Sequence, residues 1–184
     1  LVEIGSFLGR STVAIAIACK NLNKCKVLAV DPHMNSDTHK YMKVKNSLVG
    51  LKKNLTHYKL LEYVIIEKTS SPNAYSKYNK INTNFLFLDG DHRYKNVSKD
   101  FSMWSKVLNY GGYLVLHDAF NIKGPRKLMF NLLLNKNYVY IEHTADLACF
   151  RKKKVLSIRN WVKKIYSFLI IKALFIRIYK PAVS

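Results

Sequence analysis

Short runs of apolar residues alternate along this chain with longer segments in which apolar residues recur every three or four positions. The short runs predict seven β-strands, at Leu1–Gly5, Cys25–Asp31, Leu60–Glu67, Asn84–Asp89, Gly112–Asp118, Tyr138–His143 and Leu147–Arg151. The longer segments predict helices at Ser11–Asn21, Asp37–Leu51, Pro72–Tyr78, Lys95–Leu108 and Pro125–Leu134. Apolar strands that alternate with helices are typical of a parallel sheet covered on both faces, so we predict an α/β fold.

Local signals refine the ends of several predicted elements. Ser11 and Asp37 are suited to cap the N-termini of two helices, and Gly111-Gly112 is expected to break a helix ahead of the fifth strand. The last two strands are separated only by residues 144–146. A connection this short predicts an antiparallel hairpin at one edge of the sheet.

Composition and charge narrow the class of protein. The 184 residues are 49% hydrophobic, which suits one globular domain with a sizeable core. A net charge of +20 resembles that of nucleic-acid-binding proteins, but residues 151–184 hold ten Lys and Arg and no acidic residue, which is half of the excess. Basic charge is therefore weak evidence for any particular partner.

The three cysteines, Cys19, Cys25 and Cys149, are too few and too scattered for a disulfide framework or a zinc cluster. We expect reduced thiols in a cytosolic protein, with Cys19 and Cys149 in the core. No secretory signal is visible, and the chain starts at Leu1 inside a predicted strand, so we expect a preceding N-terminal segment.

Acidic residues are scarce, and several of them lie where strands end. The chain has 11 of them; Glu3 lies within the first strand, while Asp31, Asp89 and Asp118 end the second, fourth and fifth strands. Ligands of open parallel sheets bind beyond the carboxyl ends of the strands, near the point where strand order reverses. The sequence therefore predicts a site at this edge.

The turn after the first strand and the end of the second suggest a nucleoside ligand. Gly5 and Gly9 form G-x-x-x-G, which differs from the G-x-G-x-x-G of dinucleotide-binding loops and suits a ligand that carries an amino acid. Asp31 is placed to accept hydrogen bonds from both hydroxyls of a ribose. The alternatives are an ordinary strand-to-helix turn and a helix cap.

Titratable residues gather at the ends of the fourth and fifth strands. Asp89, His92, His117 and Asp118 are expected to share one pocket, because the ends of adjacent parallel strands meet. Such a cluster suits proton transfer, with Asp89, His92 and His117 as candidate catalytic residues. For any one of them the alternative is a capping or supporting role.

Taken together, the motifs resemble those of class I methyltransferases in the methyltransferase domain 24 family: V-E-I-G-x-x-x-G-x-S, V-D-P, L-D-G-D-H-x-Y and G-G-x-x-x-x-H-D. That family is related to the catechol- and caffeoyl-CoA-type O-methyltransferases and to sugar O-methyltransferases of macrolide pathways. The resemblance covers residues 1–151. It implies a Rossmann-like, doubly wound sheet of seven strands in the order 3-2-1-4-5-7-6, with the last strand antiparallel.

The resemblance also implies that S-adenosylmethionine is the cofactor. The residues that match cofactor-binding positions are Glu3, Gly5, Ser6, Gly9, Asp31, Pro32, His33, Thr69, Ser70 and Asp89. Among these, Glu3 and the glycine loop would hold the methionine part of the cofactor, and Asp31 would hold the ribose. The positions just after the second and third strands would line the adenine.

Asp89 and Asp118 match positions that bind Mg²⁺ in the metal-dependent relatives. Those relatives usually add an Asp, Glu or Asn beside the second aspartate, whereas here its neighbours are His117 and Ala119, so the oxygen-rich shell that Mg²⁺ prefers is incomplete. Two mechanisms stay open: a metal ion held by the aspartates, or His92 or His117 as a base. Either would assist in-line methyl transfer to the hydroxyl of a small molecule or sugar.

Residues 152–184 are predicted to form a basic, amphipathic C-terminal helix. Its uncharged run, 165–171, is too short to span a bilayer. Contact of residues 152–180 with an anionic membrane surface and packing against the domain or a partner subunit are equally compatible with the pattern. We therefore expect a cytoplasmic protein, either free or peripheral on the inner face of the membrane.

Other functions fit the sequence less well. An NAD(P)-dependent oxidoreductase or epimerase would share the sheet but needs a diphosphate loop, which is absent. A nucleic-acid-binding protein or RNA methyltransferase would suit the charge, yet no basic platform interleaved with aromatic residues is apparent. A catalytically inactive scaffold is disfavoured by the acidic strand ends, and homo-oligomerisation stays open.

Overall fold

The computed structural model describes residues 1–22, 25–34, 40–154, 162 and 166. Its elements are β1 (Val2–Ile4), α1 (Arg10–Leu22), β2 (Val27–Val30), α3 (Ser47–His57), the 3₁₀ helix η1 (Leu61–Tyr63), β3 (Val64–Glu67), α4 (Ser71–Tyr78), β4 (Thr83–Leu88), α5 (Tyr94–Trp104), β5 (Leu108–Leu116), α6 (Lys123–Leu134), β6 (Tyr138–Thr144) and β7 (Leu147–Lys152).

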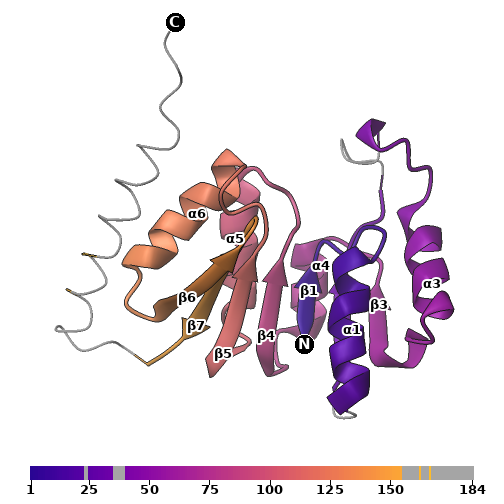
Figure 1. Cartoon of the computed structure of the whole chain (residues 1–184), viewed down its shortest axis with the longest axis horizontal. Helices are drawn as coiled ribbons and strands as arrows, with labels where there is room; N and C mark the ends of the chain where they lie inside the picture. The colour runs from indigo at the N-terminus through magenta and orange to yellow at the C-terminus, as the bar shows by residue number, and fades with distance from the viewer. Residues whose placement is uncertain (23–24, 35–39, 155–161, 163–165, 167–184) are drawn as a thin grey trace, which may run out of the picture.

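The strands form one seven-stranded sheet in the order β3-β2-β1-β4-β5-β7-β6 (Figure 1). β1 pairs in parallel with both β2 and β4, so the strand order reverses beside β1. β7 pairs antiparallel with β5 and with β6, and this makes the terminal hairpin at one edge. The predicted fold class, strand order and single antiparallel strand are confirmed.

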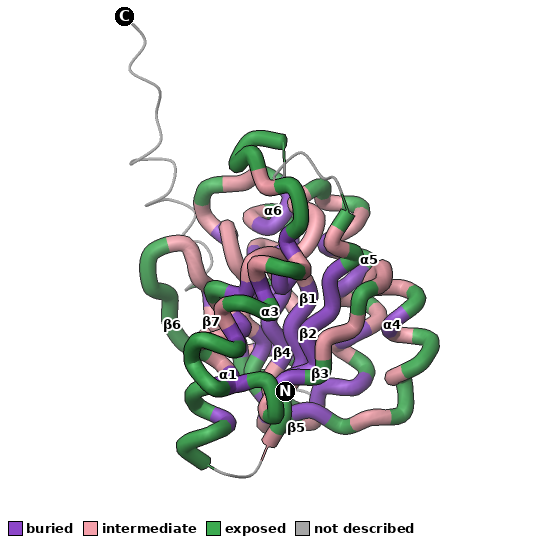
Figure 2. The backbone as a smooth tube through the Cα atoms, turned by 90° about the vertical axis from the view of Figure 1, so that its right-hand side faces the viewer, coloured by how far each residue is buried: buried purple, intermediate pink, exposed green. Residues whose placement is uncertain are grey.

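Two apolar layers cover the sheet, one on each face. Along β2, Val27 and Ala29 pack with α1 and α3, whereas Leu28 and Val30 belong to the larger cluster with α4, α5 and α6. This alternation follows from the period of two in a strand, which sends successive side chains to opposite faces. Figure 2 shows buried residues along the central strands and exposed residues on the outer sides of the helices.

Two predicted boundaries before β3 were wrong. The helix predicted at 37–51 has its N-cap at Asn46, whose side chain accepts a hydrogen bond from the backbone N–H of Val49, and it continues to His57. The predicted cap Asp37 lies outside the described residues. The third strand begins at Val64 rather than Leu60, because residues 61–63 form the 3₁₀ turn.

The glycine pair before the end of the fifth strand was also misread. Helix α5 ends at Trp104, and Gly111 and Gly112 lie inside β5, where the pairing with β4 shifts register. A Cβ at Gly112 would lie 3.0 Å from the carbonyl oxygens of Asn84 and Asn109. The pair therefore permits an irregularity within the strand instead of ending a helix.

The expectation of three reduced thiols is corrected for two of them. Cys19, at the buried side of α1, forms a disulfide with Cys25 just ahead of β2, and their Cα atoms lie 5.1 Å apart. Cys149 is free and partly buried. The α1–β2 connection brings Cys19 and Cys25 together, a pairing that their scattered positions did not suggest.

The end of the chain is described only in part. β7 runs through Lys152, whose ammonium donates to the carbonyl oxygens of Ser105 and Leu108, both at 2.6 Å. The helix predicted for 152–184 otherwise lies largely outside the described residues. Within the part of the chain that is described, no helix is both long and apolar enough to cross a membrane.

Candidate functional site

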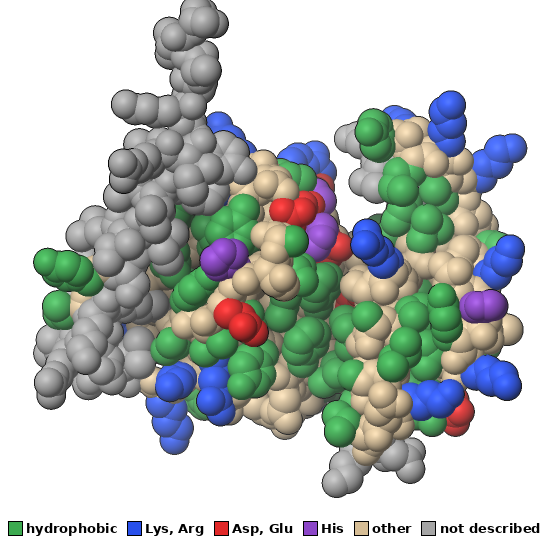
Figure 3. All heavy atoms as spheres, viewed as in Figure 1, with side chains coloured by type: hydrophobic (Ala, Val, Ile, Leu, Met, Phe, Trp, Pro, Cys, Tyr) green, Lys and Arg blue, Asp and Glu red, His purple; other side chains and the backbone are tan. Residues whose placement is uncertain are grey.

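The carboxyl ends of β1, β2, β4 and β5 meet at one edge of the sheet, as their register requires. Figure 3 shows acidic and histidine side chains gathered beside a hollow on this face of the molecule. The scarce acidic residues that the sequence placed at strand ends are therefore brought together, as expected from the position of the switch in strand order.

Gly5 brings the loop after β1 against the end of β4. It has φ +93°, and a Cβ at this position would lie 2.1 Å from the carbonyl oxygen of Asp89. Its N–H donates to Val30 on β2 at 2.8 Å, while the N–H of Asp89 donates to Ile4 at the same distance. Only glycine allows the backbone of this loop to approach the sheet so closely.

Glu3 joins β1 to the start of α1. Its side chain is fully buried, and its two carboxylate oxygens accept hydrogen bonds from the hydroxyls of Ser11 and Thr12, each at 2.5 Å. Burial raises the pKa of Glu3 to about 7, against the opposing effect of these two hydrogen bonds. Glu3 thus supports the glycine loop, and its predicted contact with the cofactor stays a prediction.

Ser6 lies in the same loop and is 2% exposed. Its buried hydroxyl has no hydrogen-bond partner among the described residues. An unsatisfied buried polar group costs about 1–3 kcal/mol, so most such groups in proteins have a partner. The Ser6 hydroxyl is therefore available to a ligand in this loop.

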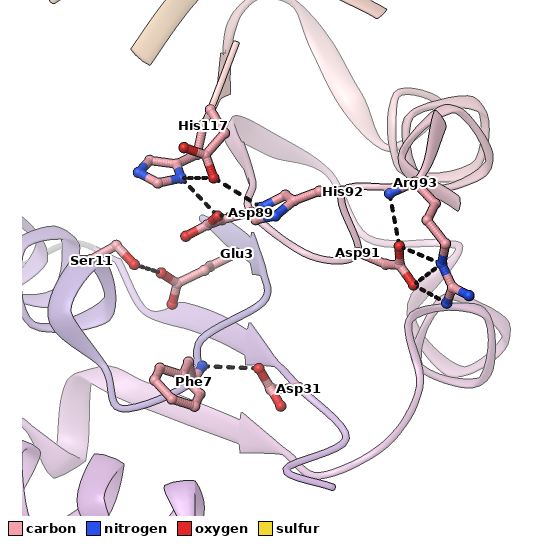
Figure 4. A network of polar contacts seen from close by, with 10 residues as sticks. Glu3, Phe7, Ser11, Asp31, Asp89, Asp91, His92, Arg93 and His117 are labelled. Carbon is pink, nitrogen blue, oxygen red and sulfur yellow. Dashed lines mark hydrogen bonds and ion pairs between the residues drawn. The ribbon is translucent and has the colours of Figure 1, made fainter. Parts of the chain in front are cut away.

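Asp31 connects the loops that follow β1 and β2. The backbone N–H of Phe7 donates to Oδ2 at 2.9 Å, and that of His33 donates to Oδ1 at 2.6 Å (Figure 4). Each carboxylate oxygen can accept more than one hydrogen bond, so these contacts leave capacity for the hydroxyls of a ribose. The position of Asp31 is compatible with the predicted ribose contact.

The residues expected near an adenine differ in how they are placed. The His33 side chain is fully buried, and its Nδ1 lies 2.8 Å from the hydroxyl of Ser47 at the start of α3, so the imidazole is turned toward that helix. Pro32 beside it is exposed. Thr69 and Ser70 are half-buried just after β3. Their adenine contacts stay predictions.

Asp89, His92, His117 and Asp118 form one compact cluster, and Figure 4 labels the first three of these residues. Nδ1 of His117 lies 2.9 Å from Oδ1 of Asp89 and 3.3 Å from Oδ2 of Asp118. Nε2 of His92 lies 3.4 Å and 3.2 Å from the same two oxygens. All four side chains are partly exposed, so the structure brings together the residues that the sequence predicted for proton transfer.

The charges in this cluster stabilise one another. The neighbouring Asp89 carboxylate raises the pKa of both His92 and His117, against partial burial. Burial opposes the charge of Asp89, but its contacts with His117 and His92 outweigh that effect and lower its pKa. The cluster therefore favours an ionised Asp89 next to imidazoles that take up a proton readily.

Backbone strain also concentrates at the strand ends. Among described residues other than glycine, six have positive φ, and three of these follow β1, β2 and β5: Phe7 at 42°, His33 at 51° and Asp118 at 52°. Such conformations cost about 1–3 kcal/mol each and persist only where surrounding contacts hold them. In this conformation the Asp118 carboxylate lies 3.2 Å from Nε2 of His92 and 3.3 Å from Nδ1 of His117.

Two further residues were not singled out from the sequence. Asp91 accepts hydrogen bonds from the backbone and guanidinium of Arg93 and from Asn96, so it organises the start of α5 behind His92. A Cβ at Gly124 would lie 1.9 Å from the carbonyl oxygen of His92, so α6 packs directly on this loop. The D-G-D-H motif contained a signal for Asp91, whereas nothing local marked Gly124.

Comparison with known proteins identifies the domain. A family model described as a methyltransferase domain, Methyltransf_24, matches residues 2–119. The chain belongs to this family. The matched part of the methyltransferase domain runs from β1 to just past Asp118, so it contains the glycine loop, Asp31 and the whole cluster. The predicted resemblance to class I, S-adenosylmethionine-dependent methyltransferases is confirmed.

A curated relative extends the comparison without assigning an activity. An uncharacterized protein of Acanthamoeba polyphaga mimivirus is 32% identical to this methyltransferase domain over 120 residues. The match covers 64% of this chain and 50% of the viral protein. The chain therefore spans about half the length of that relative.

Solved structures with the same fold include several methyltransferases. The O-methyltransferase NovP has a TM-score of 0.70 at 16% identity, covering 84% of this chain and 72% of its own. An O-methyltransferase from Bacillus cereus in complex with SAH has a TM-score of 0.64 at 15% identity, covering 83% of this chain and 73% of its own. An rRNA methylase from Streptococcus thermophilus has a TM-score of 0.59 at 13% identity, covering 83% of this chain and 86% of its own. At these identities the likeness concerns the fold alone.

Proposed function

We propose that the protein is an S-adenosylmethionine-dependent O-methyltransferase that acts on a hydroxyl of a small molecule or sugar. The observation that carries the proposal is the placement of the Asp89, His92, His117 and Asp118 cluster directly against the glycine loop, through the contact of Gly5 with Asp89. The glycine loop would hold the methyl donor, and the cluster would prepare the acceptor.

The residues of the loop fit the donor. The Ser6 hydroxyl is buried without a partner among the described residues, and the lack of a Cβ at Gly5 leaves the backbone close to the strand ends. Gly9 closes the loop, and Asp31 stands at the neighbouring strand end with acceptor capacity to spare. When bound, the cofactor supplies an electrophilic methyl group, so the protein mainly has to align donor and acceptor.

The cluster fits the acceptor's chemistry. A neutral hydroxyl is a weak nucleophile and must lose its proton during methyl transfer. Figure 4 places Nδ1 of His117 toward the carboxylates and its other ring nitrogen away from them, and the side chain is 36% exposed. A proton taken by His117 would leave an imidazolium that Asp89 and Asp118 stabilise.

Mg²⁺ does not fit this donor set well. Mg²⁺ prefers oxygen ligands in nearly ideal octahedral geometry, whereas two of the four converging donors here are imidazole nitrogens. No step of the proposed reaction is therefore assigned to Mg²⁺.

Binding and turnover together test the proposal. The full-length protein is titrated calorimetrically with S-adenosylmethionine and with S-adenosylhomocysteine, then incubated with sugars, nucleotide sugars and phenols while mass spectrometry follows the gain of a methyl group. We expect binding of both compounds and methylation of a hydroxyl in one class. Absence of affinity for both compounds would overturn the proposal.

A second candidate acceptor is RNA, which the net charge of +20 and the shared fold of an rRNA methylase favour. The same incubation with ribosomal RNA, read by release of radiolabelled methyl groups into RNA at physiological ionic strength, separates the two. Methylated RNA with no methylated small molecule would replace the hydroxyl acceptor by a nucleic acid.

A further inference from the structure

We infer that Asp89, His92, His117 and Asp118 form a binding site for a divalent transition-metal ion, such as Mn²⁺, Co²⁺ or Zn²⁺, in preference to Mg²⁺. The use of the ion would rest on the proposed function, because the same side chains are assigned to the acceptor there. The binding itself does not, because it depends only on the geometry and chemistry of these four side chains.

The four donor atoms already have the spacing of ligands around one ion. Nitrogen and oxygen alternate around a ring, with neighbouring atoms 2.9, 3.4, 3.2 and 3.3 Å apart and all four within 4.8 Å of one another. Ligands about 2.0–2.2 Å from a common metal ion lie about 2.9–3.5 Å from their neighbours in octahedral or tetrahedral geometry. The ring needs little rearrangement to coordinate an ion at its centre.

The hydrogen bonding within the ring is poor for such close contacts. Nδ1 of His117 is buried and makes no directed hydrogen bond within the described residues, although Oδ1 of Asp89 lies 2.9 Å away. The contact of His92 with the same oxygen is long, at 3.4 Å. When Nδ1 carries no proton, its lone pair faces the same space as the two carboxylate oxygens, which is the arrangement that a shared cation requires.

The donor types select the class of ion. Imidazole nitrogens suit zinc, iron, nickel and copper, whereas Mg²⁺ and Ca²⁺ are bound through oxygen. Two carboxylates balance the charge of a dication, which matters because the chain as a whole carries +20 and repels cations. Affinity must therefore come from direct coordination. Imidazole binds Mn²⁺, Co²⁺ and Zn²⁺, in increasing order, more strongly than it binds Mg²⁺.

The surrounding fold holds the ligands in place. The backbone N–H of His117 donates to Leu88 at 3.0 Å, which fixes the end of β5 against β4. Gly124 on α6 packs on the carbonyl of His92, and Asp118 is held at φ 52°. Ligands preorganised on adjacent strand ends bind a metal with little ordering cost. An ion held there would lower the pKa of an acceptor hydroxyl.

Metal binding is measured on the full-length, tag-free protein after chelator treatment. Co²⁺ titration is followed by visible absorbance, and Zn²⁺, Mn²⁺ and Mg²⁺ are compared by competition and by the shift in thermal unfolding. We expect one Co²⁺ per chain and affinity increasing from Mg²⁺ through Mn²⁺ and Co²⁺ to Zn²⁺. Mg²⁺ that competes as well as Co²⁺ would overturn the inference, and this comparison needs no variant.

Substitutions then locate the site. His92→Ala and His117→Ala should each weaken Co²⁺ binding by about tenfold or more, whereas His57→Ala, on the exposed face of α3, should leave it unchanged. His117→Asp should weaken Co²⁺ binding and strengthen Mg²⁺ binding, because it restores an oxygen-rich set. Circular dichroism verifies folding, and Asn replaces Ala at any position where the Ala variant fails to fold. Unchanged Co²⁺ affinity in both histidine variants would place the ion elsewhere and overturn the inference.

Affinity for S-adenosylhomocysteine is measured in the same samples. If Co²⁺ fails to bind while S-adenosylhomocysteine binds normally, the metal-site inference is overturned and the proposed function stands with a histidine base. If Co²⁺ binds and S-adenosylhomocysteine does not, the metal-site inference stands and the proposed function is overturned.

Discussion

The polar side chains at the strand ends differ in how much of their hydrogen-bonding capacity is already used within the protein. Glu3 is buried with both oxygens bonded to α1, and Asp31 accepts one backbone hydrogen bond on each oxygen. The Ser6 hydroxyl has no partner within the described part of the chain. Availability to a ligand thus increases from Glu3 through Asp31 to Ser6, and substitutions at the last two should separate binding from folding.

Ser6→Ala should reduce affinity for S-adenosylmethionine without destabilising the protein. Removing an unpartnered buried hydroxyl costs nothing in the ligand-free state, so the free energy of unfolding should stay the same or rise slightly. A lost ligand hydrogen bond should weaken binding about fivefold to tenfold. Calorimetry and chemical denaturation measure the two quantities. Unchanged affinity would mean that the hydroxyl faces no part of the cofactor.

Asp31→Ala should weaken cofactor binding by about tenfold or more and also destabilise the protein, since the N–H groups of Phe7 and His33 lose their acceptor. Calorimetric titration with S-adenosylhomocysteine gives the affinity. Glu62→Ala removes an exposed carboxylate from η1 and is the matched control. Equal affinities in wild type and Asp31→Ala would contradict the ribose assignment.

His117→Ala and Asp89→Ala should each lower turnover by about tenfold or more, and in His117→Ala cofactor affinity should stay nearly intact. Both side chains belong to the cluster that prepares the acceptor, and neither oxygen of Asp89 is needed for the contact of its backbone with Gly5. Steady-state methylation assays at saturating cofactor measure the effect. Wild-type turnover in both variants would remove these residues from the mechanism.

At the scale of elements, the site depends on how closely the β1–α1 loop approaches the end of β4. The loop is joined to β2 through the Gly5 N–H and to β4 through the carbonyl of Ile4. A change in the loop is therefore expected to affect the position of Asp89.

Gly5→Ala should destabilise the protein far more than Gly111→Ala. Both glycines have positive φ, at 93° and 86°, so both substitutions carry the conformational cost of about 1 kcal/mol. An added Cβ at Gly5 would lie 2.1 Å from the carbonyl oxygen of Asp89, whereas at Gly111 its nearest neighbour would be the Arg151 guanidinium at 3.9 Å. Urea denaturation of both variants gives the two losses in the free energy of unfolding, and their difference measures the cost of the close contact at Gly5. Equal destabilisation would show that the loop relaxes freely.

Several element boundaries could not be read from periodicity. The helix predicted to reach Leu108 ends at Trp104, because β5 continues through the Gly111-Gly112 irregularity to pair with Thr83 on β4. Local pattern does not reveal such pairing, since glycines signal a helix end and a strand bulge equally well. The strand order, by contrast, followed from motifs that marked the family.

In the packing of the whole molecule, a third buried carboxylate, after Glu3 and Asp31, links two helices. Asp100 on α5 is 8% exposed and accepts a hydrogen bond at 2.5 Å from the Ser71 hydroxyl on α4, which in turn accepts one from the Trp104 indole at 2.9 Å. Burial raises the pKa of Asp100 to about 6, and the Ser71 hydrogen bond opposes this only partly. Its ionisation should therefore affect global stability.

Asp100→Asn should stabilise the protein at pH 8 and change it little at pH 4. A carboxyl whose folded pKa is raised binds its proton more tightly in the folded state, so its contribution to stability is lost as pH rises from 3.8 through about 6. The loss amounts to about 3 kcal/mol at most, and the amide avoids it while still accepting from Ser71. Denaturation curves at both pH values test this. A stability difference that does not depend on pH would exclude ionisation as its cause.

Periodicity and residue type are local properties, so the amino-acid pattern was enough to predict the seven strands, their alternation with helices and the carboxylates where β2, β4 and β5 reach the site. The direction in which each side chain faces depends on contacts between distant parts of the chain. His33 turns toward α3, Glu3 bonds to α1, and the donors of His92 and His117 meet two aspartates at 2.9–3.4 Å. These directions depend on strained backbone and on packing by distant segments such as Gly124, which no local pattern encodes.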